Sequence, residues 1–260
     1  MNILEELAGA ARVRVKEAKQ RVSAATVQSQ ASSLAADTGF PFEAALGGAG
    51  LSFICEVKKA SPSKGLIAPD FPYVEIAREY EAAGADAVSV LTEPTRFLGE
   101  DAFLAEISAA VSLPTLRKDF VVDSYQIYEA KLLGASAVLL ICALLGEAEL
   151  ASFIRIADGL GLSCLVEAHS AEETRAALAA GARVVGVNHR DLTTFSMDLG
   201  LSERLRPLVP PGVLFVAESG ISGPGDTRRM KAIGADAVLV GESFMRAADK
   251  AALLRELKDV

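Results

Sequence analysis

The sequence feature that most constrains the fold of this chain is a short glycine-alanine motif, which occurs four times. The copies span residues 84–88, 134–138, 181–185 and 234–238 and begin 50, 47 and 53 residues apart. Each copy follows a stretch with the apolar spacing of an amphipathic helix. Glycine is the usual residue just past a helix end, because it adopts the left-handed conformation at little cost. Each copy also opens an apolar run typical of a strand buried on both faces.

Four further apolar runs of the same kind lie between these copies, at residues 52–57, 113–118, 163–167 and 213–218. From residue 52 onward, strand and helix patterns therefore alternate eight times. Such alternation favours right-handed βαβ units and a parallel sheet. Eight units in roughly 200 residues predict a closed (β/α)8 TIM barrel. The alternative is an open doubly wound sheet, which a G-x-G-x-x-G turn after the first strand would favour, and the sequence has none there.

Local signals agree with this helix assignment. Asp123 is expected to cap the helix that follows it, and Ser170 with Glu173 forms a capping-box pattern. Pro72 fits the first turn of another helix. Residues 1–46 precede the repeat, and their apolar residues fall on one helical face: Ile3, Leu4, Leu7, Ala11, Val15, Ala18 and Val22. We predict one domain over residues 1–260, in which residues 1–46 are a helical extension with an extra helix lying across one barrel end.

Composition excludes several classes of protein. The longest unbroken apolar run has nine residues, 137–145, whereas a membrane-spanning helix needs about 20. Glu5 and Glu6 stand where an export signal has basic and apolar residues, and the three cysteines are odd in number and far apart. Both features predict a cytoplasmic protein. The net charge of −8 disfavours nucleic acid or an anionic membrane as a partner but allows a small anionic substrate.

The carboxyl ends of the predicted strands carry ionisable residues, and active sites of such barrels lie at those ends. Glu56 and Lys58 share one strand face, and Lys118, Glu167 and Glu218 end three other strands. Lys and Glu are rarely buried unless paired. One interpretation is a ring of structural salt bridges. The other is a catalytic cluster, because closely packed opposite charges perturb each other's pKa values, which suits acid–base chemistry.

Although the protein is acidic overall, four basic residues are expected at the same barrel end: Lys58, Lys64, Lys118 and Arg190. This predicts a small anionic substrate. Ser219-Gly220 and Gly241-Glu242-Ser243 follow the last two strands, where barrels of this kind bind phosphate through backbone N–H groups. Glycine at 220 and 241 would let the backbone approach the anion closely. We expect the Glu242 carboxylate to turn outward, so that only its N–H contributes.

The two histidines do not predict a metal site. No metal-ligand spacing accompanies His169 or His189, so we expect no metal and no other cofactor. His169 is expected at the rim and His189 facing away from the cavity. The cysteines Cys55, Cys142 and Cys164 fit buried small apolar positions. A Schiff base on Lys118 or Lys58 remains an alternative chemistry.

The strand-end motifs resemble those of the indole-3-glycerol phosphate synthase family. The most specific is EVKKASPSKG at residues 56–65. Five others follow in the order of that family: LRKDF at 116–120, LVEAH at 165–169, NHRDL at 188–192, AESGI at 217–221 and LVGES at 239–243. The resemblance covers about residues 42–246, and the N-terminal helix is similar too. One departure is His189, where many members carry another small polar residue.

The resemblance implies conversion of 1-(2-carboxyphenylamino)-1-deoxyribulose 5-phosphate to indole-3-glycerol phosphate, with release of carbon dioxide and water, in tryptophan biosynthesis. No cofactor is required. Together with charge and position, it implies Lys118 as general acid at the ketone and Glu167 as the base in dehydration. Lys58 is expected to pair with the substrate carboxylate. The remaining candidates are orienting groups Glu56 and Glu218, a hydrogen-bonding Asn188, and anion contacts at Ser61 and Arg190.

Other functions remain open from the sequence. Phosphoribosylanthranilate isomerase and the tryptophan synthase α subunit share the architecture, but the first would use a Cys and Asp pair that no strand end supplies. A lysine Schiff-base aldolase and a non-catalytic barrel are further alternatives, although the latter would be expected to lose part of its ionisable rim. The acidic helical exterior favours a monomer.

Overall fold

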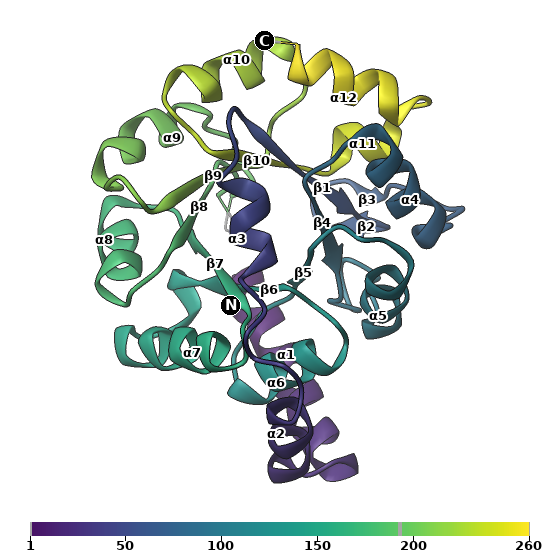
Figure 1. Ribbon diagram of the computed structural model, residues 1–260, viewed down its shortest axis with the longest axis vertical. Coiled ribbons are helices and arrows are strands. Elements are labelled where there is room, and N and C mark those ends of the chain that lie inside the picture. The colour runs from purple at the N-terminus through teal and green to yellow at the C-terminus, as the bar shows by residue number, and fades with distance from the viewer. Residues whose placement is uncertain (1, 192–193, 260) are drawn as a thin grey trace.

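In the computed structural model, which describes residues 2–191 and 194–259, eight parallel strands close into a barrel (Figure 1). In spatial order the strands run β1-β10-β9-β8-β7-β6-β5-β4 and back to β1. Their bounds are β1 (Ser52–Val57), β4 (Ala87–Leu91), β5 (Thr115–Lys118), β6 (Ala137–Ile141), β7 (Ser163–Ala168), β8 (Val184–Asn188), β9 (Leu214–Glu218) and β10 (Ala237–Val240). The prediction of a closed (β/α)8 barrel is confirmed.

Helices surround the barrel and connect its strands. They are α4 (Tyr73–Ala83), α5 (Asp101–Ala110), α6 (Ser124–Leu132), α7 (Glu147–Gly159), α8 (Ala171–Ala179), α9 (Gly200–Leu205), α10 (Pro224–Ala232), α11 (Glu242–Arg246) and α12 (Lys250–Lys258). Two short 3-10 helices, η1 (Cys142–Leu144) and η2 (Arg206–Leu208), lie in the connections. A small antiparallel pair, β2 (Ala60–Ser61) and β3 (Gly65–Leu66), follows β1 and was not expected from the sequence.

The local signals were mostly correct. Gly84 ends α4 in the left-handed conformation at φ 88°, and the Asp123 side chain accepts a hydrogen bond from Tyr125 N as the N-cap of α6. Two expectations were wrong. Pro72 is the N-cap of α4, not a residue of its first turn. Ser170 caps Glu173 N, but the Glu173 carboxylate accepts from His169 N, so the capping box is not closed in its usual form.

Alternation along each strand divides the core in two. Outward side chains such as Val88, Val138 and Val185 pack under the helices in one large cluster. Inward side chains form a second cluster that fills the barrel: Ile54, Ala87, Leu116, Ala137, Leu139, Leu165, Val184, Val216, Ala237 and Leu239. The barrel is therefore packed through its middle. In the described strands, inward-facing charged groups lie at the carboxyl ends, and the polar side chains deeper in the barrel, such as Ser89 and Ser163, are small.

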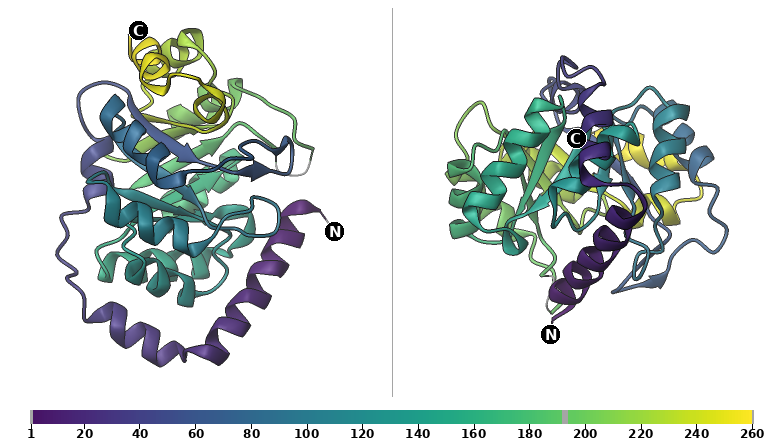
Figure 2. Two further views of the ribbon diagram at one scale, coloured as in Figure 1. Left: turned by 90° about the vertical axis from the view of Figure 1, so that its right-hand side faces the viewer. Right: turned by 90° about the horizontal axis from the view of Figure 1, so that it is seen from below.

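The segment before β1 forms three described helices instead of the single helix expected from the apolar face. They are α1 (Ile3–Arg21), α2 (Ala24–Ser32) and α3 (Pro41–Leu46). Figure 2 shows the chain starting on one side of the barrel and reaching α3 on the opposite side. Leu4 and Leu7 of α1 and Phe42 and Leu46 of α3 belong to the cluster inside the barrel. The extension therefore covers both barrel ends, and α2 packs against α6 between them.

Among the described residues, no helix is both long enough and apolar enough to cross a membrane.

Candidate active site

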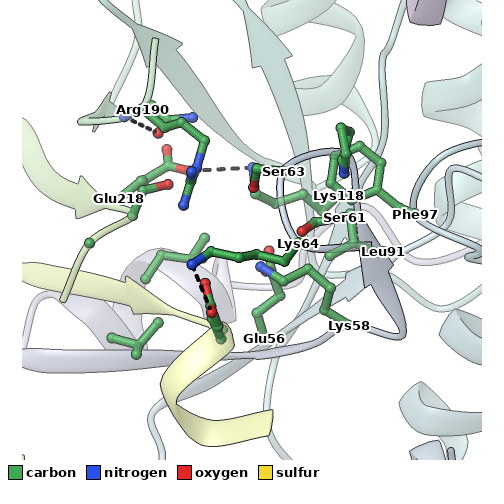
Figure 3. A pocket seen from close by; sticks show the side chains of 18 of the residues that line it. Glu56, Lys58, Ser61, Ser63, Lys64, Leu91, Phe97, Lys118, Arg190 and Glu218 are labelled. Carbon is green, nitrogen blue, oxygen red and sulfur yellow. Dashed lines mark hydrogen bonds and ion pairs between the residues drawn. The ribbon is translucent and has the colours of Figure 1, made fainter. Parts of the chain in front are cut away.

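A cavity of about 460 Å³ opens at the carboxyl ends of the strands (Figure 3). This volume fits a small-molecule substrate. Its lining includes every residue that the sequence placed in the site: Glu56, Lys58, Ser61, Lys118, Glu167, Asn188, Arg190, Glu218, Ser219, Gly220, Gly241, Glu242 and Ser243. Leu192, the last residue of the NHRDL motif, lies outside the described residues. The fold thus brings together residues from the ends of six barrel strands, β1, β5, β7, β8, β9 and β10, and Ser61 of β2.

Glu56 and Lys58 form a close ion pair on one side of the cavity. Because they are two residues apart at the end of β1, both point inward, and Lys58 Nζ donates to Glu56 Oε1 at 2.5 Å. The Glu56 carboxylate is almost fully buried, whereas Lys58 keeps 16% of its side chain exposed toward the cavity. Lys58 therefore has both a fixed partner and access to an incoming anion.

Lys118 lies between two buried carboxylates on the other side. Its Nζ is 3.4 Å from Glu167 Oε2 and 3.4 Å from Glu218 Oε2. Burial alone would lower the pKa of Lys118, but the charges of Glu218, Glu167 and Glu56 outweigh it and raise the pKa. Lys118 is therefore a stable cation, able to donate a proton or hydrogen bond into the cavity.

The two carboxylates beside Lys118 differ in pKa. Burial opposes the charge on Glu167, yet Lys118, His169 and a hydrogen bond from Asn188 outweigh it and lower the pKa. Burial raises the pKa of Glu218 to about 7, with Glu167 adding to the effect. Apart from the ion pair with Lys118, neither carboxylate oxygen of Glu218 has a hydrogen-bond partner. Such a split between adjacent carboxylates is typical of sites that assign different proton-transfer roles.

The raised pKa of Glu218 gives a prediction for stability. The folded protein binds this proton more tightly than the unfolded chain, where the pKa is about 4.5. The stabilisation is therefore complete below that pH and lost as the pH rises through about 7. Since glutamine does not ionise, Glu218→Gln should gain stability relative to the parent between pH 5 and 8, on the order of 1–3 kcal/mol. Urea unfolding across that range measures the difference.

The exposed Glu149→Gln provides the control, for which the difference from the parent should not change with pH. A pH-independent difference for Glu218→Gln as well would show that Glu218 titrates normally in the folded protein.

The two turns expected to bind phosphate lie side by side. Ser219 and Gly220 both have left-handed backbone, at φ 68° and 77°. For serine this conformation is strained, and such strain concentrates at functional sites. Ser243 Oγ donates to Ile221 O at 3.0 Å and so joins this turn to the start of α11. Its hydroxyl therefore connects the two turns.

The Glu242 side chain departs from the sequence expectation. Instead of turning outward, its carboxylate lies at the cavity edge, where Oε1 is 3.4 Å from Lys64 Nζ and 3.2 Å from Arg246 Nε. Burial opposes its charge, but Lys64 and Arg246 outweigh it and lower the pKa of Glu242. At the cavity edge, these two cations neutralise a carboxylate that would otherwise repel an anion.

Of the other predicted residues, Asn188 and Ser61 line the cavity, whereas the two histidines do not. Asn188 Oδ1 accepts from Arg190 N at 3.0 Å, which fixes the strand end of β8. Ser61 is buried in β2 at the cavity wall. His189 is buried away from the cavity lining, between Ser219 O at 2.8 Å and Ser202 Oγ at 2.6 Å. His169 is at the rim but behind Glu167, and its Nε2 is 3.4 Å from Glu167 Oε1.

The three cysteines are not among the residues that line the cavity. Cys55 and Cys164 are buried, and Cys142 is half-buried. Burial raises the pKa of each thiol, which makes all three poor nucleophiles. Within the described ranges, no group of three or more His, Cys, Asp or Glu residues could hold a metal ion.

Sequence reasoning missed an apolar wall on one side of the cavity. It contains two aromatic rings, Phe97 after β4 and Phe120 after β5, whose centroids are 6.3 Å apart. Ile3, Leu4 and Leu7 of α1 complete it. These side chains carry neither charge nor a turn signal, so strand-end chemistry does not reveal them. The apolar face of α1 was visible in the sequence, but not that it covers the cavity.

Glu93, another strand-end acid, supports that wall from behind. Its buried carboxylate accepts hydrogen bonds from Thr95 N, Thr95 Oγ1, Arg96 N and Phe97 N, at 2.5–3.0 Å. Arg96 in turn pairs with Glu6 of α1 at 2.6 Å. The acid therefore organises the loop that carries Phe97 and does not line the cavity.

Comparison with known proteins places this geometry in one family. The family model "Indole-3-glycerol phosphate synthase" matches residues 4–257. An indole-3-glycerol phosphate synthase of Ruminiclostridium cellulolyticum is 54% identical over 256 residues, which cover 98% of each chain. One from Endomicrobium trichonymphae is 52% identical over 257 residues, covering 99% of this chain and all of the relative.

Solved structures support the fold alone. A 3-hexulose-6-phosphate synthase from Salmonella typhimurium has a TM-score of 0.66 at 16% identity, covering 80% of this chain and 97% of that one. A thiamine phosphate pyrophosphorylase from Pyrococcus furiosus has a TM-score of 0.60 at 18% identity, covering 80% and 93%.

Proposed function

Because this chain belongs to the indole-3-glycerol phosphate synthase family, we propose specific roles for its rim residues in the reaction of that family. The enzyme is a carboxy-lyase of tryptophan biosynthesis. It converts 1-(2-carboxyphenylamino)-1-deoxyribulose 5-phosphate to indole-3-glycerol phosphate and releases carbon dioxide and water. The substrate has an anionic phosphate at one end and a benzoate at the other, so the cavity needs two anion sites and an apolar surface between them.

The cavity walls support one orientation of the substrate. The phosphate lies against Ser219-Gly220 and Gly241-Glu242-Ser243, whose backbone N–H groups are its hydrogen-bond donors. Helix α11 has only five residues, so these N–H groups rather than a helix dipole hold the anion. The carboxyphenyl ring packs on Phe97 and Phe120. Arg190 and Ser61 are additional polar contacts for the anionic groups.

In this orientation, the ketone of the substrate lies near Lys118 and Lys58. Lys118, a stable buried cation, is the general acid that protonates the ketone oxygen when the ring attacks it. Lys58 pairs with the benzoate carboxylate until carbon dioxide leaves, and it shares acid duties when the hydroxyl departs. Glu56 and Glu218 orient and stabilise these cations.

Glu167 and Asn188 act in the dehydration. Glu167 is charged at neutral pH because its pKa is lowered, so it is able to accept the proton released as the indole forms. Asn188 hydrogen-bonds the anilino nitrogen or a sugar hydroxyl. The raised pKa of Lys118 also argues against the Schiff-base alternative, since that chemistry begins with a neutral amine.

The observation that carries the proposal is Lys118 paired with both Glu167 and Glu218 beside an open cavity. The direct test is to incubate the purified protein with the carboxyphenylamino substrate and to record indole fluorescence and carbon dioxide. Equimolar formation of both, with no added metal or cofactor, is the expected result. Carbon dioxide release without indole, or no turnover, would contradict the proposal. We further propose a cytoplasmic monomer in which residues 1–260 form one domain.

Gly241 gives a prediction about the Glu56–Lys58 pair. A Cβ added there would lie 2.4 Å from Glu56 Oε1 and 2.8 Å from Lys58 Nζ. Gly241→Ala should therefore displace the pair, and we expect kcat/KM to fall at least about 10-fold, since small misplacements of catalytic groups are costly. In the matched control Gly225→Ala, the new Cβ meets nothing within 4 Å. Parental kcat/KM in Gly241→Ala would mean that the position of this pair is not critical.

A further inference from the structure

A chain of three side chains leads away from the catalytic cavity behind Glu167. Glu167 Oε1 faces His169 Nε2 at 3.4 Å, and His169 Nδ1 faces Glu173 Oε2 at 3.5 Å. Glu173 is also anchored to the backbone, because the same Oε2 accepts His169 N at 2.7 Å. The imidazole therefore lies between two carboxylates, and the outer one is fixed by the start of α8.

The sequence spacing explains how these groups meet. Glu167 and His169 are two residues apart at the end of β7, so their side chains leave the same face of the strand. Ser170 then caps α8, and Glu173 falls in the first helical turn, where its carboxylate reaches back over the strand end. The departure from the usual capping box is what brings Glu173 to His169.

Each oxygen of Glu167 has a different environment. Oε2 is turned to Lys118 in the cavity, at 3.4 Å. Glu167 Oε1 and His169 Nε2 are both buried without a hydrogen-bond partner, and they face each other. Two buried polar atoms left unpaired are costly, and a proton held between them removes that cost for both.

We propose that His169, held by Glu173, is the positioning residue that orients Glu167 for proton abstraction. The imidazolium donates a hydrogen bond to Glu167 Oε1 on the side away from the cavity. Glu167 Oε2 then remains available to the substrate and Lys118. This arrangement follows the logic of catalytic triads, in which the base is oriented by a third group. The inference rests on the proposed role of Glu167 as the base.

The charges around His169 are consistent with an imidazolium. Burial alone would lower its pKa, but Glu173, Glu167 and Glu218 outweigh it and raise the pKa. These acids come from α8, β7 and β9, and Cys142 of η1 approaches the backbone of Glu173. Protonated His169 in turn helps to lower the pKa of Glu167. Removing the imidazole should therefore raise the pKa of the base.

The test compares His169→Asn with Glu173→Gln. For His169→Asn we expect kcat to fall about 10-fold with KM within about twofold, because orientation of the base affects the chemical step and not binding. Carbon dioxide should appear ahead of indole, as in a variant that lacks the base. The acid limb of the kcat–pH profile should move to higher pH by roughly one unit, as expected when an opposite charge within about 4–6 Å is lost.

Glu173→Gln should shift the same three measurements in the same direction but less, because glutamine still accepts from His169 N. It also keeps the test valid if His169→Asn does not fold. The matched control is Glu172→Gln, an exposed acid in the same helical turn that should leave all three measurements at parental values.

The outcomes separate this inference from the proposed function. If Glu167→Gln is impaired while His169→Asn and Glu173→Gln keep parental kcat, product timing and pH profile, His169 does not position the base. A lower kcat with matched carbon dioxide and indole release and an unmoved acid limb overturns the inference too, since that pattern shows a structural role alone. If Glu167→Gln itself turns over normally, the proposed base is wrong.

Discussion

Replacing Lys118 with alanine should reduce kcat by at least about 10²- to 10⁴-fold, the usual contribution of a positioned general acid. The ketone that the ring attacks is not activated, so ring closure depends on a proton donor at its oxygen. Lys118 is held as a cation by Glu167 and Glu218, each 3.4 Å away. Steady-state indole fluorescence measures the loss, and activity within about threefold of the parent would exclude Lys118 as the acid.

Two further variants separate chemistry from folding in this experiment. Lys118→Ala leaves two buried carboxylates without a cation, so stability should fall as well, most strongly at high pH. Lys118→Arg keeps the positive charge but is a far weaker acid, and it should remain inactive while recovering stability. In the control Lys131→Ala, the lost side chain belongs to α6, the helix after β5, and donates to Ala35 O at 2.7 Å away from the cavity, so activity should be parental.

Replacing Glu167 with glutamine should slow the reaction mainly after ring closure. Glutamine keeps the shape and a hydrogen-bonding oxygen but does not accept a proton at neutral pH. Decarboxylation should continue while dehydration stalls, so carbon dioxide release should run ahead of indole formation by about 10²-fold or more in rate. Rapid mixing with parallel detection of both products measures this separation.

The exposed Glu147→Gln is the control for removing one carboxylate, and its two products should appear together at the parental rate. Matched and fast release of both products from Glu167→Gln would show that another group takes the proton. An equal slowing of both products would instead place Glu167 at or before ring closure.

Much of the site was predictable because barrel geometry is regular. Once alternating strands and helices indicate a (β/α)8 barrel, the last inward residue of each strand must face the same space. Lys118, Glu167 and Glu218 hold such positions, and their charge is conspicuous within apolar strands. The same alternation predicted that His189 lies outside the cavity, since it is one residue past inward-facing Asn188.

Features that depend on packing between distant segments were not predictable. Phe97 reaches the wall only because Glu93 folds its loop through four hydrogen bonds. The path of residues 2–46 over both barrel ends depends on contacts more than 90 residues apart, such as Arg14 Nη2 with Asp119 Oδ1 at 2.7 Å. No local periodicity encodes such partners.

The sequence by itself determined the barrel, the set of charged groups at its rim and the family, since strand period, helix period and strand-end chemistry are all local properties of the chain. Only the tertiary structure decided how those charges pair and which carboxylate remains ionised. Glu167 and Glu218 are the same residue type at equivalent strand ends, yet the pKa of one is lowered and that of the other is raised to about 7. The physical reason is that both are buried, but His169 and a hydrogen bond from Asn188 help to offset the burial of Glu167, whereas the charges of Glu167 and Glu56 add to the effect of burial on Glu218.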